Sequence, residues 1–139
     1  MVASTPLPGY PVKAKVYNNM IISPRDRYAF VDGSDEPWDE LFWDYNLYYP
    51  AADVNSLFYF GRDVPRDAHS VLANPRFAAD QPQTAEQFKL RSGSPAIDAA
   101  IDVGLTVDFA GQSIPQGNGP DIGAFEFSPA PSFGGTQNP

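Results

Sequence analysis

The feature that most constrains the fold is a short apolar segment that breaks at asparagine and then occurs a second time. Residues 17–22 (YNNMII) align with residues 44–49 (DYNLYY), so that Asn19 falls on Asn46, 27 positions later. Because asparagine tolerates left-handed backbone torsions, each break indicates a bend between two short strands. A strand–bend–strand unit that recurs at this period is typical of stacked, solenoid-like layers rather than of a sandwich.

The other apolar segments are also short, and turn-forming residues separate them. The chain has 15 prolines and 11 glycines in 139 residues, which disfavours long helices. Alternation and apolar content predict strands in residues 12–22, 41–49, 57–60, 70–73 and 122–127. Two segments are ambiguous: 84–91 suits a helical turn or a loop before a strand, and 95–103 has the spacing of an amphipathic helix.

The composition limits the possible domain organisation of the chain and the classes of partner that it can bind. We expect an extended lead-in over residues 1–11, one folded domain over 12–127 and a flexible tail over 128–139. The net charge of −8 disfavours nucleic acid and anionic membranes as partners, and no apolar run is long enough for membrane insertion. Residues 1–11 lack the pattern of a signal peptide, so we expect any such signal elsewhere in a longer gene product.

Two absences limit the chemistry. The chain has no cysteine, which excludes disulfides, thiolate catalysis and cysteine-ligated metals. It has one histidine, His69, so a multi-histidine metal site would require more than one chain. The order Asp67-Ala68-His69-Ser70 does not indicate a catalytic triad, because triad partners meet through the fold, and a structural role is the favoured interpretation of His69.

The C-terminal part of the chain resembles a known family. Residues 90–99 (LRSGSPAIDA) and 121–126 (DIGAFE) resemble the terminal segment of right-handed parallel β-helix repeat proteins, which are pectate-lyase-like in fold. Residues 67–77 and 44–49 resemble the two segments that precede it there. This chain departs from the family pattern at Ala100, where Gly is usual, at Asn74, where Asp is usual, and in lacking the long upstream run of coils.

The resemblance implies an all-β fold, namely a short right-handed parallel β-helix of two to four coils with an irregular C-terminal cap. It also implies an association with polysaccharide and an extracellular or cell-surface location. The first coil has no obvious cap. We expect its open edge to be covered by a second copy of the chain in a homo-oligomer, by residues 1–11 or by a missing domain.

The residues that carry the resemblance are predicted to be architectural. Gly93 and Gly123 suit tight turns, because a residue without Cβ accepts positive φ. Asp98 and Asp121 are short acceptors for backbone N–H groups at such turns. A set of apolar side chains is expected to fill the interior of the last coil: Ile97, Ile122 and Phe125.

An aromatic cluster is the best candidate for ligand binding. Sugar rings stack on flat aromatic faces, and nearby carboxylates and amides bind the hydroxyl groups. The predicted carbohydrate-binding residues are Trp38, Trp43, Tyr45 and Tyr48. The alternative is that half of the aromatic residues fill the interior.

Acidic side chains supply the candidates for catalysis and for metal binding. Two facing carboxylates suit glycoside hydrolysis, and the candidates are Asp35, Glu36, Asp39 and Glu40. Asp32 and Asp35 are candidate calcium ligands, although no cofactor is required. A polysaccharide lyase needs a cation and a base, for which Lys13 and Lys15 are available, but the negative charge of the chain disfavours an anionic glycan.

Three functions remain open from the sequence. The favoured one is a non-catalytic module that binds polysaccharide through an aromatic and acidic face. The second is a small glycan-degrading enzyme, either a glycoside hydrolase or a polysaccharide lyase. The third is a structural end cap of a longer cell-surface β-helix protein.

Overall fold

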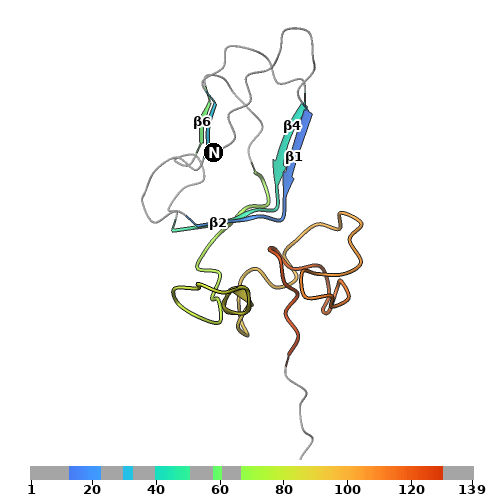
Figure 1. Cartoon of the computed structure of the whole chain (residues 1–139). Helices are drawn as coiled ribbons and strands as arrows, with labels where there is room; N and C mark the ends of the chain where they lie inside the picture. Colours follow the sequence, from blue (N-terminus) through green and yellow to red (C-terminus); the bar gives the residue numbers. More distant parts are fainter. Residues whose placement is uncertain (1–12, 23–29, 33–39, 51–57, 61–66, 130–139) are drawn as a thin grey trace, which may run out of the picture.

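The described part of the chain is built from short strands in parallel sheets. A computed structural model describes residues 13–22, 30–32, 40–50, 58–60 and 67–129 (Figure 1). This part contains no α-helix, and its longest strands have five residues. The strands are β1 (Lys13–Tyr17), β2 (Met20–Ile22), β3 (Phe30–Asp32), β4 (Glu40–Asp44), β5 (Leu47–Tyr49), β6 (Phe58–Phe60) and β7 (Val71–Leu72).

Every named strand pairing is parallel, and three strands of one segment pair with the corresponding strands of the next. β1 pairs with β4, so that Tyr17 lies beside Asp44, and β2 pairs with β5, so that Met20 lies beside Leu47. β3 pairs with β6, and β7 adds a third strand beside β5. The alignment of residues 17–22 with 44–49 predicted from the sequence is therefore confirmed, and β3 and β6 pair with an offset of 28 residues. Figure 1 shows β1 and β4 side by side. β2 runs across the lower ends of these two strands, and β6 lies on the other side of the strand region from β1 and β4.

The bend between the strands is the same in both segments. Asn18 has φ 60° and Tyr45, which occupies the equivalent position, has φ 56°. The left-handed residue predicted at the asparagine pair is therefore confirmed. The same conformation is costly for a bulky residue such as Tyr45 and has to be held by its surroundings.

The apolar core lies on one face of the sheet formed by β2, β5 and β7. Leu47 is fully buried there and packs in one cluster with Leu90, Ala96 and Ile122. Met20 and Val71, the neighbours of Leu47 in register, pack against the same cluster. Because side chains alternate along a strand, Tyr48 points to the opposite face.

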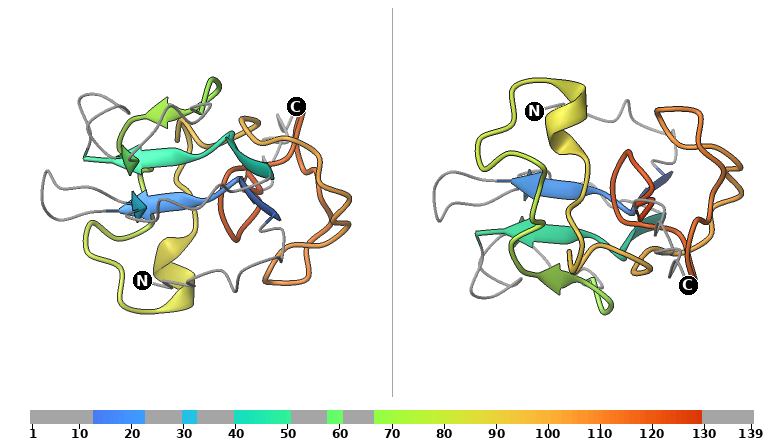
Figure 2. Two further views of the ribbon diagram at one scale, coloured as in Figure 1. Left: turned by 90° about the horizontal axis from the view of Figure 1, so that it is seen from above. Right: turned by 90° about the horizontal axis from the view of Figure 1, so that it is seen from below.

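The C-terminal segment, residues 77–127, covers this face of the sheet. Figure 1 shows it on the side of β2 away from β1, β4 and β6, and Figure 2 shows its loops spread beside and beneath the strands. Ile122 and Phe125 are buried as expected, but Ile122 packs against the outer face of the sheet, where Leu47 lies. The segment was predicted to fill and cap the last coil, and it forms an added layer instead.

Carboxylates replace regular secondary structure in this segment by binding backbone N–H groups. Asp121 accepts hydrogen bonds from Asp98 N at 2.8 Å and Phe127 N at 2.6 Å. Asp98 accepts one from Gly119 N, and the buried Glu126 accepts from Gln116 N and Asp121 N. The turn roles predicted for Asp98 and Asp121 are confirmed, as is positive φ at Gly93 and Gly123.

Two secondary-structure predictions for this segment are wrong, and one is confirmed. Residues 95–98 form a turn instead of a helix, and residues 122–125 form bends, followed by irregular backbone at 126–127, instead of a strand. In both places the backbone groups bond to side chains and to distant loops, as Ile122 N does to Ala96 O. The helical turn predicted in 84–91 is a 3-10 helix, Ala85–Phe88. In the part of the chain that the structure describes, no helix is long and apolar enough to cross a membrane.

Candidate functional site

Most of the predicted catalytic and metal residues lie where the structure gives no side-chain positions. Asp35, Glu36, Trp38 and Asp39 fall outside the described residues. Asp32 ends β3 and Glu40 begins β4, and only the backbone is described at both positions. The hydrolase and calcium assignments of these residues therefore stay predictions. Among the described residues, no three acidic or histidine side chains converge on a metal position.

The three other aromatic candidates occupy different environments. Trp43 and Tyr45 are partly exposed. Tyr48 is only 1% exposed, and its hydroxyl donates a hydrogen bond to Asp67 at 2.9 Å. That burial removes Tyr48 from the predicted sugar-binding surface, because its ring has no face open to a ligand. The alternative that part of the cluster fills the interior describes Tyr48 correctly.

The pairing of β1 with β4 creates an exposed face that carries aromatic and charged side chains. Lys15 lies beside Phe42, and Tyr17 lies beside Asp44. Alternation places these four residues on one side of the two strands, while Val16 and Trp43 point to the other. Phe42 is 46% exposed and Lys15 is exposed. We call Lys15, Tyr17, Phe42 and Asp44 the β1–β4 face.

Asp44, at the end of this face, binds His69. The Asp44 carboxylate accepts a hydrogen bond from His69 N at 2.9 Å through Oδ1, and its Oδ2 lies 2.8 Å from His69 Nδ1. The backbone N of Tyr45 donates to the same Oδ1 at 3.0 Å. Burial acts to raise the pKa of Asp44, but the hydrogen bonds from His69 and Tyr45 outweigh it, so that the pKa lies below its ordinary value.

The rings of Tyr45 and His69 are stacked against each other. Their centroids are 4.5 Å apart and their planes differ by 11°. Each ring therefore keeps one face for other contacts, and each helps to fix the other. The His69 side chain is 58% exposed. No partner of His69 could be predicted from the sequence, because Asp44 lies 25 residues away and no short motif joins them.

Asp67 lies behind Asp44 and is buried, with 4% of its surface exposed. Its Oδ2 accepts hydrogen bonds from Asn46 Nδ2 and Tyr48 OH, each at 2.9 Å. Burial raises the pKa of the Asp67 carboxyl above its ordinary value, and the hydrogen bonds from Asn46 and Tyr48 only partly oppose this. Asp44 and Asp67 also interact directly and shift each other's pKa.

One oxygen of Asp67 lacks a hydrogen-bond donor in the described part of the chain. Asp67 Oδ1 is buried and accepts no hydrogen bond from any described residue. A buried carboxylate oxygen without a donor disfavours the ionised form, in line with the raised pKa of Asp67. Because the pKa of Asp44 is lowered, Asp44 is the member of this pair that ionises first as the pH rises.

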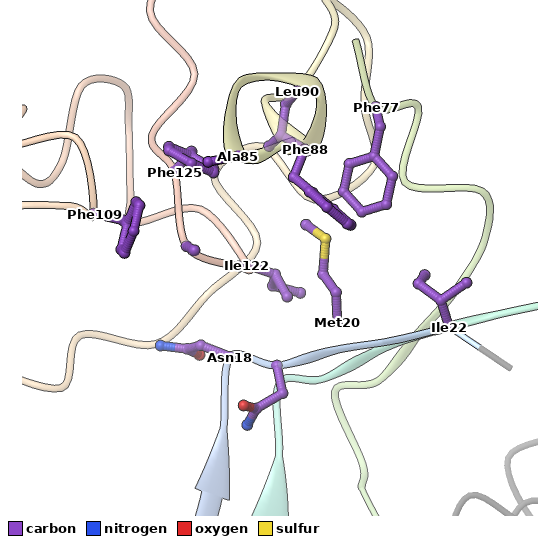
Figure 3. Close-up of a pocket in the computed structure, with 13 residues that line it drawn as sticks. Asn18, Met20, Ile22, Phe77, Ala85, Phe88, Leu90, Phe109, Ile122 and Phe125 are labelled. Atoms are coloured by element: carbon purple, nitrogen blue, oxygen red, sulfur yellow. The ribbon is translucent and has the colours of Figure 1, made fainter. Parts of the chain in front are cut away.

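A separate cavity lies on the face of the β2–β5–β7 sheet that the C-terminal segment covers. Its volume is about 510 Å³, and Figure 3 shows Met20, Phe77, Phe88 and Phe109 among the side chains around it. The lining is mainly apolar, with Asn18 and Asn19 as its polar residues, and none of the residues of the Asp44–His69 cluster belongs to it. A mainly apolar cavity offers few groups to bind sugar hydroxyls.

Comparison with known proteins adds no family to this description. No family model, curated protein or solved structure matches the chain. The functional interpretation therefore depends on the geometry of the β1–β4 face and of the residues that adjoin it.

Proposed function

We propose that this chain is a short right-handed parallel β-helix module that binds polysaccharide through the β1–β4 face, outside the cell or at its surface. The parallel pairing of three successive strands with their counterparts 27 or 28 residues later supports the β-helix. The C-terminal motifs that resemble β-helix proteins support the same assignment, with the C-terminal segment as a lateral layer.

The observation that carries the binding proposal is the exposure of Phe42 within an ordered, parallel pair of strands. Phe42 is 46% exposed, and its neighbour in register is the cationic Lys15. The stacked rings of Tyr45 and His69 adjoin the end of the same face. Flat aromatic surfaces flanked by polar groups, on rigid strands, match the alternating C–H and hydroxyl surfaces of a sugar chain.

The described acidic pair does not support glycoside hydrolysis. The two carboxyls of a glycosidase are separated by about 5 Å or more, to admit the scissile bond and, in inverting enzymes, a water molecule. Asp44 and Asp67 interact with each other, and Asp67 is buried. The pair therefore serves to hold the neighbouring residues in place, while Asp35, Glu36, Asp39 and Glu40 stay the predicted residues of the glycan-degrading alternative.

A glycan panel tests the proposal. Soluble polysaccharides are titrated into the full chain while tryptophan fluorescence and calorimetric heat are recorded, and product release is assayed in parallel. Phe42→Ala is expected to weaken binding roughly tenfold, which corresponds to about 1.4 kcal/mol, and to leave the unfolding midpoint nearly unchanged.

The control is Phe109→Ala, because Phe109 is 74% exposed in the C-terminal segment and far from the β1–β4 face in sequence. Equal effects of both substitutions, or the absence of binding across the panel, would contradict the proposal. Release of products would replace it with an enzymatic function.

A further inference from the structure

The hydrogen-bonding capacity of Asp44 is already used within the protein. Its Oδ1 accepts from Tyr45 N and His69 N, and its Oδ2 faces His69 Nδ1. A carboxylate offers about four such positions. Three of them are taken within the protein, which leaves Asp44 little capacity for a sugar hydroxyl, although it lies on the β1–β4 face.

The same contacts determine which nitrogen of His69 carries the proton. An ionised carboxylate only accepts hydrogen bonds, so the 2.8 Å contact with Asp44 requires a proton on Nδ1. In a neutral imidazole, Nε2 is then an unprotonated acceptor. The His69 side chain is 58% exposed, and its Nδ1 edge is the one turned to Asp44, so we take Nε2 to be the acceptor that a ligand can reach.

The imidazole is also held in one orientation before any ligand arrives. Asp44 hydrogen-bonds to both the backbone and the ring of His69, and the ring stacks on Tyr45. Asp67 supports Asp44 from the buried side and is itself held by Asn46 and Tyr48. Fixing a recognition group in advance reduces the entropy that binding would otherwise cost.

From this geometry we infer that His69 Nε2 is the group that recognises the glycan, as the acceptor of one sugar hydroxyl. The inference rests on the proposed function and names its ligand class: neutral polysaccharide. A uronate carboxylate carries no proton to give to Nε2, and Asp44 adds negative charge beside it. Of the described titratable groups, Asp44 and Tyr45 adjoin the imidazole directly, and Asp67 lies behind Asp44.

Protonation of the imidazole reverses this preference. Nε2 becomes a donor and the ring becomes cationic, so the hydrogen bond from the sugar hydroxyl is lost. A hydroxyl then stays bound only by turning to accept from Nε2, whereas an anionic group is favoured. Neutral-glycan affinity is therefore expected to fall as His69 takes up its proton.

The first test needs no ligand. His69 is the single histidine of the chain, so the imidazole nitrogen signals of a ¹⁵N-labelled sample belong to it alone. Long-range ¹H–¹⁵N spectra of the full chain are expected to show a protonated Nδ1 and an unprotonated Nε2 while the ring is neutral. A proton on Nε2 in the neutral ring would overturn the inference, whatever the protein binds.

The second test separates this inference from the proposed function. Binding of a neutral polysaccharide is measured from about pH 8 to pH 5, a range in which imidazoles change charge, for the natural chain, His69→Ala, His69→Gln and Phe42→Ala. His69→Ala is expected to lose about tenfold in affinity, and His69→Gln, whose amide oxygen can accept the same bond, should bind without the pH dependence.

Binding that Phe42→Ala weakens but His69→Ala and pH leave unchanged would overturn this inference alone. Equal or tighter binding of a polyuronate by the neutral form would also overturn it. Absence of binding in every variant and at every pH would overturn the proposed function, and the glycan-recognition role of His69 with it.

Discussion

Asn46 binds Asn19 through both the backbone and the side chain of the earlier residue. Its Oδ1 accepts hydrogen bonds from Asn19 N at 2.9 Å and Asn19 Nδ2 at 3.1 Å. Its Nδ2 donates to Val16 O and to Asp67 Oδ2, each at 2.9 Å. One buried amide therefore joins two segments whose strands are paired in parallel and connects them to the acidic cluster.

Asn46→Ala is expected to lower the free energy of unfolding by at least about 3 kcal/mol, because several buried partners lose a hydrogen bond at once. Chemical denaturation followed by circular dichroism measures the loss. Asn46→Asp is the matched control: it keeps the acceptor for Asn19 but loses both donors and adds a carboxyl beside Asp67. Its loss should grow as the pH rises and the new carboxyl ionises, and a pH-independent loss would contradict the arrangement.

Asp67→Asn is expected to keep or increase stability at neutral pH, because burial makes the charged carboxylate costly, whereas a neutral amide oxygen still accepts from Asn46 and Tyr48. Asp67→Ala leaves those two donors without an acceptor and should cost about 2 kcal/mol or more. Denaturation curves of both variants at neutral pH make the comparison.

The same pair of variants tests the pKa of Asp67. A carboxyl whose pKa is raised by folding contributes stability that is fully present below its unfolded pKa of about 3.9 and is lost as the pH rises through the folded value. The stability of Asp67→Asn relative to the natural chain should therefore increase as the pH rises from the unfolded pKa through the folded pKa of Asp67. The raised pKa of Asp121 persists in both proteins and cancels from the difference. A difference that does not change with pH would show that Asp67 has no raised pKa.

Gly123→Ala is expected to destabilise the protein by about 1–3 kcal/mol for two separable reasons. Gly123 has φ 115°, and an added Cβ would lie 2.9 Å from Met20 Cε. Adding Met20→Ala removes the steric part and leaves the backbone part, so the double-mutant cycle should show favourable coupling. Strict additivity would indicate that the C-terminal segment does not approach Met20.

Leu47→Ala is expected to cost about 2–5 kcal/mol, because Leu47 is fully buried between β5 and the C-terminal segment. Leu72→Ala is the control on the neighbouring strand β7, where the side chain is 39% exposed, and it should cost less than about 1 kcal/mol. Thermal unfolding of both variants provides the comparison. Similar losses would contradict the position of the core on this face of the sheet.

The local features of the fold could be predicted from the sequence because they depend on residues close together in the chain. The repeat of Asn19 at Asn46 follows from matching short patterns, and parallel stacking then brings matched strands into register. Positive φ at Asn18, Gly93 and Gly123 follows from what these residue types tolerate. The turn roles of Asp98 and Asp121 follow from the short reach of an aspartate side chain.

The tertiary structure decided which surfaces are covered and which distant residues meet. Met20, Leu47 and Tyr48 are all apolar or aromatic, so the pattern alone does not show that Leu47 faces the C-terminal segment while Tyr48 is buried against Asp67. The same holds for Asp44, whose meeting with His69 depends on how one layer lies on the next. Periodicity and turn chemistry act within a few residues, whereas burial and the pairing of charges are set by the layer that packs on top.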